Sequence, residues 1–323
     1  MRIVTDPLGP IEGLTRSAVT IGAYDGVHLG HRTVLEAVCA EAAGFGGTSA
    51  VVTFDRHPAQ VVRPESAPLL LCDLEQKLEL LERTGVDLAV VIHFDEARAK
   101  ETAEDFVRTL LVDALRAKSV IVGEDFHFGH RRQGNVALLA ELGAELGFTV
   151  RGHHLVGPDG RDARDEAQVS STAIRRALVE GRLADANRML GRDHEMRGPV
   201  VEGDRRGRTI GFPTANVAIP DSMLVPADGI YAGWLDERTG KGRTVPAAIY
   251  IGHRPTFYDD GAATVVEVHA LSEVGDIYGV EVGVRMSHRI RGDLRFDSVE
   301  ELAAQLALDC DAARRLLGVV DSP

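Results

Sequence analysis

The chain of 323 residues carries a formal net charge of −13 at pH 7, and 44% of its residues are hydrophobic while 26% are charged. These proportions are typical of a globular protein long enough for two domains, and the acidic balance argues against nucleic acid or an anionic membrane as a partner. No apolar run reaches the roughly 18 residues of a membrane span. Residues 1–10 lack a signal-peptide pattern, so we expect a cytoplasmic protein.

The three cysteines, Cys39, Cys72 and Cys310, lie far apart along the chain. An odd number at such spacing forms neither a disulfide framework nor a zinc pattern. We therefore expect them to be small, buried apolar side chains.

Three arginine clusters stand out against the acidic background, each beside a Gly- or Ser-rich turn. They are Arg131-Arg132, Arg175-Arg176 and the cluster at 205–208. Their positions indicate small anionic ligands such as nucleotides, with solvated surface charge as the alternative.

Strand-like and helix-like runs alternate from residue 15 to about residue 185. The strand-like runs are 18–21, 50–54, 88–94, 120–122 and 148–150. The helix-like runs between them are 32–43, 74–84, 103–117 and 136–146. Repeated strand–helix–strand units predict an α/β fold with a doubly wound parallel sheet. Ligands bind such sheets beyond the carboxyl ends of the strands, and the polar turns expected there are 25–31, 55–58, 123–129 and, later, 170–172.

The first of these turns lies within residues 20–32, which predict a strand, a tight turn and then the start of a helix. A helix N-terminus offers free N–H groups and the positive end of the helix dipole, which suit phosphate. His28 and His31 lie there three residues apart, and Gly30 allows a ligand to approach the backbone. The pair predicts a phosphate site. A metal pair, for which no third ligand lies nearby, and ordinary surface residues are the alternatives.

Residues 170–175 open another helix, whose apolar face is formed by Ile174, Ala177 and Leu178. Hydroxyl side chains at a helix start are ordinary N-caps. Three hydroxyls followed one turn later by Arg175 can also bind phosphate oxygens. Both interpretations remain open from the sequence.

From about residue 198, β-branched runs follow one another without helices between them. They are 200–202, 230–235, 245–251, 264–271 and 280–286. This pattern predicts antiparallel strands in a closed barrel. A last helix is expected after Ser298, and the residues predicted for its apolar face are Val299, Leu302, Ala303 and Leu306. The change of pattern predicts an N-terminal domain over 1–186 and a C-terminal domain over 187–323.

The stretch 203–216 contains three glycines and an arginine pair, so its backbone N–H groups can wrap around phosphate. Thr214 and Asn216 alternate in an extended run, which puts their side chains on one face. Two neutral oxygen ligands suit Mg²⁺ that already carries nucleotide phosphates. A Gly-Pro turn that leads into a strand is the alternative.

Glu267 lies in the otherwise apolar strand-like run 265–269, on the face opposite to Val266 and Val268. A partly buried carboxylate can act as a general base. A barrel-rim carboxylate in a salt bridge is the alternative. The chain contains neither G-x-x-x-x-G-K-[ST] nor G-x-G-x-x-G, so the ordinary P-loop and dinucleotide folds are not indicated.

Taken together, these motifs resemble the bifunctional prokaryotic riboflavin kinase/FAD synthetase (FMN adenylyltransferase) family, in family order over nearly the whole chain. The segments similar to the nucleotidyltransferase motifs are 22–31, 54–58, 123–129 and 170–175. Those similar to the kinase barrel are 207–216, 254–257, Glu267 and 276–279. The departures from the family pattern are Tyr24, His127, Tyr250 and 272–274, and they bear on flavin affinity rather than on the type of reaction.

The resemblance implies two ATP-dependent reactions with Mg²⁺, in which flavins are substrates and products. Glu267 would accept the proton when riboflavin is phosphorylated to FMN, while Thr214 and Asn216 hold the metal. The phosphate of FMN would then attack a second ATP to give FAD and pyrophosphate, with His28, His31 and Arg175 as catalytic residues. ATP, riboflavin and FMN are the expected partners, with no nucleic acid or membrane. The oligomeric state is left open.

The resemblance also assigns binding residues. Those expected to bind ATP and its phosphates are Gly22, Tyr24, Asp25, Gly30, Asp125, Ser171, Thr172, Gly207, Arg208, Gly211, Phe212 and Pro213. Those expected to bind flavin are His57, Pro58, Phe126, Phe128, Arg254 and Thr256. Two other functions are weighed against this one: a nucleotidylyltransferase for another phosphorylated substrate with an accessory barrel, and a non-catalytic flavin-binding regulator.

Overall fold

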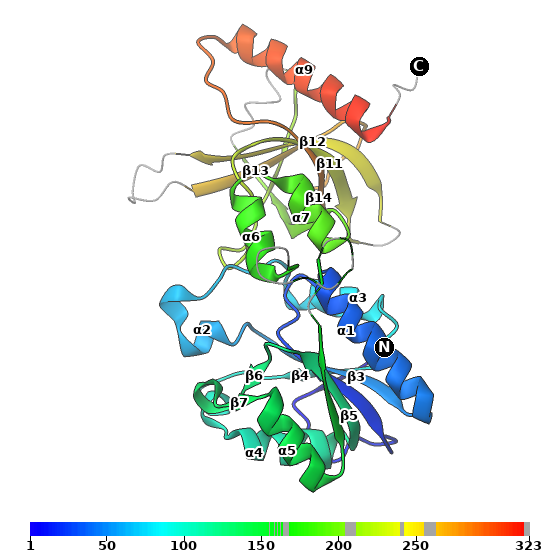
Figure 1. Ribbon diagram of the computed structural model, residues 1–323. Coiled ribbons are helices and arrows are strands. Elements are labelled where there is room, and N and C mark those ends of the chain that lie inside the picture. The colour runs from blue at the N-terminus through cyan, green and yellow to red at the C-terminus, as the bar shows by residue number, and fades with distance from the viewer. Residues whose placement is uncertain are drawn as a thin grey trace. The chain divides into compact units, whose positions relative to one another are not determined.

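The structure, a computed structural model, describes residues 1–154, 156–157, 159, 161, 163, 168–203, 211–239, 242–254 and 263–319. The chain divides into two compact units, Met1–Ser171 and Thr172–Pro323, which Figure 1 shows as a layered α/β unit and a barrel unit. No described helix is long and apolar enough to cross a membrane.

The first unit is built on six parallel strands in the order β1-β4-β3-β2-β5-β8. Its strands are β1 (Arg2–Thr5), β2 (Ser17–Ile21), β3 (Thr48–Phe54), β4 (Leu88–Ile92), β5 (Ala117–Gly123), the short pair β6 (His127–Phe128) and β7 (Gly134–Asn135), and β8 (Thr149–His153). Its helices are α1 (Leu29–Phe45), α2 (Ala59–Val62), η1 (Pro64–Ser66), α3 (Leu74–Glu82), η2 (Arg98–Lys100), α4 (Ala103–Phe106), η3 (Val107–Ala114), η4 (His130–Arg132) and α5 (Val136–Leu146). The predicted doubly wound parallel sheet is confirmed.

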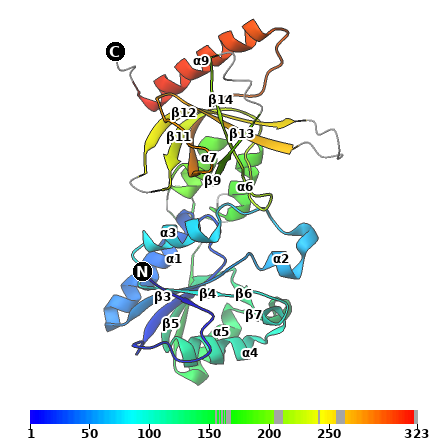
Figure 2. The same cartoon turned by 180° about the vertical axis from the view of Figure 1, so that it is seen from behind.

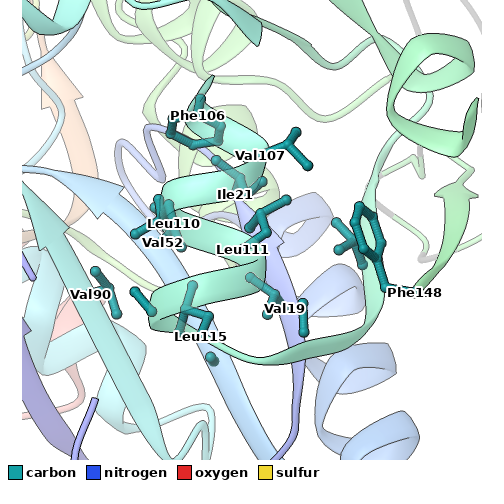
Figure 3. Close-up of a cluster of buried hydrophobic side chains, with 14 of the residues drawn as sticks. Val19, Ile21, Val52, Val90, Phe106, Val107, Leu110, Leu111, Leu115 and Phe148 are labelled. Carbon is teal, nitrogen blue, oxygen red and sulfur yellow. The ribbon is translucent and has the colours of Figure 1, made fainter. Parts of the chain in front are cut away.

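Apolar side chains cover both faces of this sheet, which explains why the sequences of its central strands are nearly continuous apolar runs. Figure 3 shows Val19, Ile21, Val52 and Val90 of three strands on one side, facing Leu110 and other residues of η3. Ala18, the residue before Val19, instead packs with Val34 and Val38 of α1 on the other side. The alternation follows from the two-residue period of a strand.

Besides the short elements α2, η1, η2, η4, β6 and β7, which were not predicted, two parts of the first unit differ from the prediction. The strand β1 was missed because it is a short edge strand, largely exposed, without a clear apolar pattern. The helix predicted to end at residue 117 ends earlier, because Arg116 has φ of 49° and turns the chain so that Ala117 can begin β5. It also becomes π-helical from Val107 onward.

The second unit is a closed antiparallel barrel in the order β10-β13-β12-β11-β14-β9, as predicted. Its strands are β9 (His194–Val201), β10 (Ala215–Val217), β11 (Gly229–Glu237), β12 (Thr244–Arg254), β13 (Ala263–Ala270) and β14 (Glu281–Arg291). Its helices are α6 (Ser171–Val179, which begins one residue before the unit), α7 (Leu183–Leu190) and α9 (Val299–Leu317). The predicted apolar face of α6 is buried.

The last helix, α9, packs on the barrel (Figures 1 and 2), and three of the four residues predicted for its apolar face, Leu302, Ala303 and Leu306, are half-buried. The fourth, Val299, is exposed, and the most deeply buried residues, Cys310 and Ala313, lie further along the same face and pack against Ala232 and Ala248. Small residues on both sides let the helix approach the strands closely. Asp309, also buried, is fixed by two hydrogen bonds from the guanidinium of Arg291, at 3.0 and 2.7 Å.

The predicted burial of the cysteines holds for two of the three. Cys72 and Cys310 are buried and Cys39 is half-buried, and none forms a disulfide. Burial raises the pKa of the Cys310 thiol to about 11, so this side chain is neutral beside the acidic Asp309.

A histidine is buried in the barrel unit. His194 of β9 is 2% exposed, and its Nε2 has no hydrogen-bond partner in the described part of the chain. Burial, together with the positive charge of Arg192, lowers the pKa of His194 to about 3, although a hydrogen bond to the backbone of Leu224 raises it. The ring is therefore neutral in the folded protein well below neutral pH.

We expect the barrel to lose stability as the pH falls below about 6.5, the ordinary histidine value, because the unfolded chain then binds a proton that the folded ring does not. The loss should approach about 1.4 kcal/mol per pH unit until the pH nears the folded value. His194→Gln should flatten this slope. Urea unfolding at several pH values, followed by the fluorescence of the single tryptophan, Trp234 on β11, measures it.

The exposed His288 on β14 provides the control, because His288→Gln should keep the parent slope. Equal slopes for the parent and for His194→Gln would show that His194 titrates normally.

Candidate active sites

The turn between β2 and α1 has an unusual backbone. Tyr24, Gly26 and Val27 have φ values of 51°, 80° and 37°, in the left-handed region. This conformation suits glycine but strains a β-branched residue, and Val27 is fully buried. Strained backbone persists only where surrounding contacts fix it, and it gathers at functional sites.

His28 and His31 lie directly after this turn, at the start of α1. His28 is the N-cap residue, and its Nδ1 accepts a hydrogen bond from the N–H of His31 at 3.3 Å. The two rings stack with their centroids 3.6 Å apart, and the Tyr24 ring lies 4.8 Å from that of His31. Across the described residues, no group of three His, Cys, Asp or Glu side chains is arranged to hold a metal.

The turn also contacts a segment far away in the sequence. The hydroxyl of Ser171 donates a hydrogen bond to the carbonyl of Asp25 at 2.9 Å. A Cβ added at Gly30 would lie 3.3 Å from the carbonyl oxygen of Val169 and from the His28 ring, so glycine allows this close approach. Thr172, exposed, and Arg175, half-buried, follow Ser171 on α6.

Asp25 itself points into the protein. Its carboxylate is buried, and Oδ1 accepts hydrogen bonds from the backbone N–H groups of Leu71 at 2.9 Å and Cys72 at 3.2 Å. This was not foreseen from the sequence, where Asp25 was grouped with the ATP-binding residues.

The turn after β3 is tied to the end of β4 by Asp55. Its carboxylate accepts hydrogen bonds from the N–H of Phe94 at 3.0 Å and pairs with His93 at 2.7 Å. Partial burial raises the pKa of Asp55, but the hydrogen bonds from Phe94, Arg56 and His93 outweigh it and hold the pKa below its ordinary value. In the same turn, His57 Nδ1 accepts the N–H of Ala59, and Pro58 precedes α2.

The residues after β5 are divided between surface and core. Asp125 is exposed and Phe126 is half-buried, whereas Phe128 is buried in the apolar core. The rings of Phe126 and Phe128 stack with centroids 5.4 Å apart, and Phe128 also packs against Phe106. Since the strands are parallel, these turns follow the same edge of the sheet as the histidine turn, as the sequence predicted.

In the second unit, the predicted carboxylate is at the centre of a polar cluster on the barrel. Glu267 lies directly opposite Asn216 on one neighbouring strand and Tyr250 on the other. The hydroxyl of Thr214 donates a hydrogen bond to Glu267 Oε2 at 3.2 Å. Val266 and Val268 are buried on the other face of β13.

The chain before β10 approaches this cluster closely. A Cβ added at Gly203 would lie 2.2 Å from Asn216 Nδ2, so any larger residue at position 203 would clash with this side-chain amide. At the far end of the loop, the carbonyl of Pro213 accepts a hydrogen bond from His269 at 2.7 Å, and Phe212 packs against the same ring. Gly211 has φ of 88°. Gly207 and Arg208 lie outside the described residues.

A cleft of about 710 Å³ adjoins Thr214. Its lining combines apolar side chains with polar ones: Val200, Leu235, Val268, Ala270 and Ile277, with Glu202, Ser272, Asp276 and Tyr278. Its size and mixed lining are those of a small-molecule site. Of the two flavin residues predicted here, Arg254 ends β12 with its backbone opposite Ala263, and Thr256 lies outside the described residues.

The two halves of the chain match two protein-family models. Residues 11–173 match the model described as FAD synthetase, and residues 190–317 match the model described as riboflavin kinase. The chain belongs to the bifunctional riboflavin kinase/FMN adenylyltransferase family. The predicted family, and a transferase with both activities, are thereby confirmed.

Relatives of this family match over almost the full length. The bifunctional riboflavin kinase/FMN adenylyltransferase of Escherichia coli K12 is 38% identical over 93% of this chain and 93% of its own. That of Listeria monocytogenes is 37% identical, over 90% and 89%. A solved structure, named as a macrolide-efflux protein from Streptococcus pneumoniae, has a TM-score of 0.82 at 30% identity and covers 96% of this chain and 98% of its own.

Proposed function

We propose that the two activities of this family occur at separate sites, FMN adenylylation on residues 1–186 and riboflavin phosphorylation on residues 187–323. The observation that carries this division is that each half holds its own cluster: the stacked histidines at the start of α1, and the Thr214–Glu267–Asn216 cluster on the barrel. The compact units divide earlier, after Ser171, so α6 folds with the barrel although its first turn belongs to the adenylylation motifs.

For the kinase reaction, we propose Glu267 as the general base. Its Oε2 already accepts a hydrogen bond from one hydroxyl, that of Thr214, so it is placed to accept one from the ribityl 5′-hydroxyl of riboflavin. As that oxygen attacks the γ-phosphorus of ATP, Glu267 takes the proton, the bond to the β-phosphate oxygen breaks, and FMN and ADP result. A positioned base of this kind contributes about 10²- to 10⁴-fold in rate.

The donor set beside Glu267 suits the magnesium that we expect to accompany ATP. The Thr214 hydroxyl and the Asn216 amide oxygen are neutral oxygen ligands, and Mg²⁺ commonly takes few protein ligands besides phosphates and water. When bound, Mg²⁺ supplies positive charge to the phosphates. We propose that the loop containing Gly207, Arg208, Gly211, Phe212 and Pro213 covers the phosphates of ATP.

The cleft next to Thr214 suits a flat heteroaromatic ring, because apolar side chains form much of its wall. Both kinase substrates, ATP and riboflavin, carry such a ring. We propose that the cleft receives one of them and that Arg254 and Thr256 contact the flavin.

For adenylylation, we propose that His28 and His31 bind the triphosphate of ATP at the N-terminus of α1. The phosphate of FMN is already an anion, so its oxygen can attack the α-phosphorus without a protein nucleophile, and pyrophosphate leaves. The demands on the protein are positioning and neutralisation of charge. We propose Ser171, Thr172 and Arg175, at the start of α6, as ligands of the leaving pyrophosphate.

The remaining residues at the sheet edge fit binding roles. We propose that Gly22, Tyr24, Gly30 and Asp125 contact ATP, and that His57, Pro58 and Phe126 contact FMN. Phe128 is buried beneath Phe126, so we propose that it supports the flavin contact from the core.

Glu267→Gln keeps the size and polarity of the side chain but removes the base. We expect FMN formation to fall by at least about 10²-fold, while FAD formation from supplied FMN stays at the parent rate. Chromatographic separation of FMN and FAD after incubation with ATP and Mg²⁺ measures both reactions. Glu300→Gln, an exposed carboxylate in the first turn of α9, should change neither. Parent-like kinase turnover in Glu267→Gln would rule out the assigned base.

The combined change His28→Ala and His31→Ala should have the opposite effect. Riboflavin should still become FMN, which accumulates, while FAD formation falls by about 10²-fold or more because charged phosphates lose their ligands. The kinase activity of the same molecule serves as the control for folding and concentration. FAD formation at the parent rate would exclude a phosphate site at the start of α1.

A further inference from the structure

A lysine is buried beneath the histidine turn. Lys77 lies on the face of α3 that also carries the buried Leu80 and Leu81, and it is 7% exposed. Its ammonium group donates hydrogen bonds to the carbonyl of Phe54 at 2.7 Å and to that of Ala23 at 3.2 Å. One carbonyl ends β3 and the other follows β2, so a single side chain ties together the two turns assigned to flavin and ATP.

The same segment holds the turn at three further points. Asp25 accepts the N–H groups of Leu71 and Cys72, as described above, and the N–H of Gly26 donates to the sulfur of Cys72 at 3.1 Å. Residues 71–77 thus bond to Ala23, Asp25 and Gly26, which directly precede the strained Val27.

Burying the charged ammonium group of Lys77 costs free energy. Burial lowers the pKa of Lys77, against the opposing effects of Cys72, Asp25 and Asp55, which raise it. An ammonium group removed from water is tolerated only where it is hydrogen-bonded and balanced by negative charge. A methionine of similar length would fill the same space without this requirement, so packing alone does not account for a lysine.

We propose that Lys77 and Asp25 are positioning residues of the adenylylation site, which hold the β2–α1 turn so that His28 and His31 meet the triphosphate. This inference rests on the proposed function of the histidine pair. Among the described residues, the Lys77 ammonium donates its hydrogen bonds to two backbone carbonyls, so we assign it an action through the turn rather than on the reacting atoms. Since small displacements of a binding group can cost about 10²-fold in rate, loosening this turn should lower the rate of FAD formation.

The test is Lys77→Met in the full-length protein. We expect the kcat of FAD formation from supplied FMN to fall by about 10- to 100-fold and the KM for ATP to rise, with riboflavin kinase activity unchanged. Lys100→Met, which removes an exposed lysine from the same unit, should leave both activities at the parent level. A merely destabilised unit would contain fewer active molecules and show a lower kcat with an unchanged KM.

A second variant separates hydrogen bonding from packing. Lys77→Arg keeps the charge and the donors, whereas Lys77→Met keeps the shape, so the positioning account predicts more FAD formation with Arg than with Met. Hydrogen exchange should also show faster exchange at the amides of Gly26 and Val27 in Lys77→Met, with the buried amides of β3 unchanged.

Two results would overturn the inference: a Lys77→Met protein with the parent kcat and KM for ATP, or one at least as active as Lys77→Arg. The proposed function has its own test, since it fails if the variant lacking His28 and His31 makes FAD normally. Loss of activity in that variant but not in Lys77→Met would reject the positioning role alone.

Discussion

The first unit depends on how the turn between β2 and α1 is held. Its backbone takes a left-handed conformation at Tyr24, Gly26 and Val27, which is unfavourable for two of these residues. Separate parts of the chain fix it: the buried Lys77, the amides that bind Asp25, and Ser171 from the start of α6. The result is a helix N-terminus with two stacked histidines at the sheet edge, where parallel sheets bind ligands.

In the second unit, the register of the strands, rather than a strained turn, positions the residues of the candidate site. Antiparallel pairing sets Asn216 and Tyr250 directly opposite Glu267, and the chain before β10 brings Thr214 within hydrogen-bonding distance. A shift of one residue in this register would turn Glu267 toward the barrel interior. The buried Val266 and Val268 prevent that shift, because their apolar side chains would become exposed. Core packing therefore fixes the position of the candidate base.

Local patterns were enough to predict the parallel sheet, the closed barrel and the face of Glu267, since each follows from periodicity and strand alternation. Long-range contacts were not predictable in this way. The burial of Phe128 depends on its packing against Phe106, and the deeper burial of Cys310 and Ala313 than of the first turns of α9 depends on the small residues of the strands beneath them. Lys77 gave one local signal, a lysine on the apolar face of a helix, but its partners are carbonyls of two distant turns. The inward direction of Asp25 likewise depends on Leu71 and Cys72.

The central claim is that two complete sites lie on one chain and work independently. Its most direct test mixes two variant proteins, Glu267→Gln and the variant with His28→Ala and His31→Ala, and supplies riboflavin, ATP and Mg²⁺. Each alone should fail to make FAD from riboflavin. Together they should make it, after a lag that shortens as the protein concentration rises, because FMN released by one variant is used by the other. No FAD from the mixture, although each variant still performs its remaining reaction on supplied substrate, would contradict two independent sites.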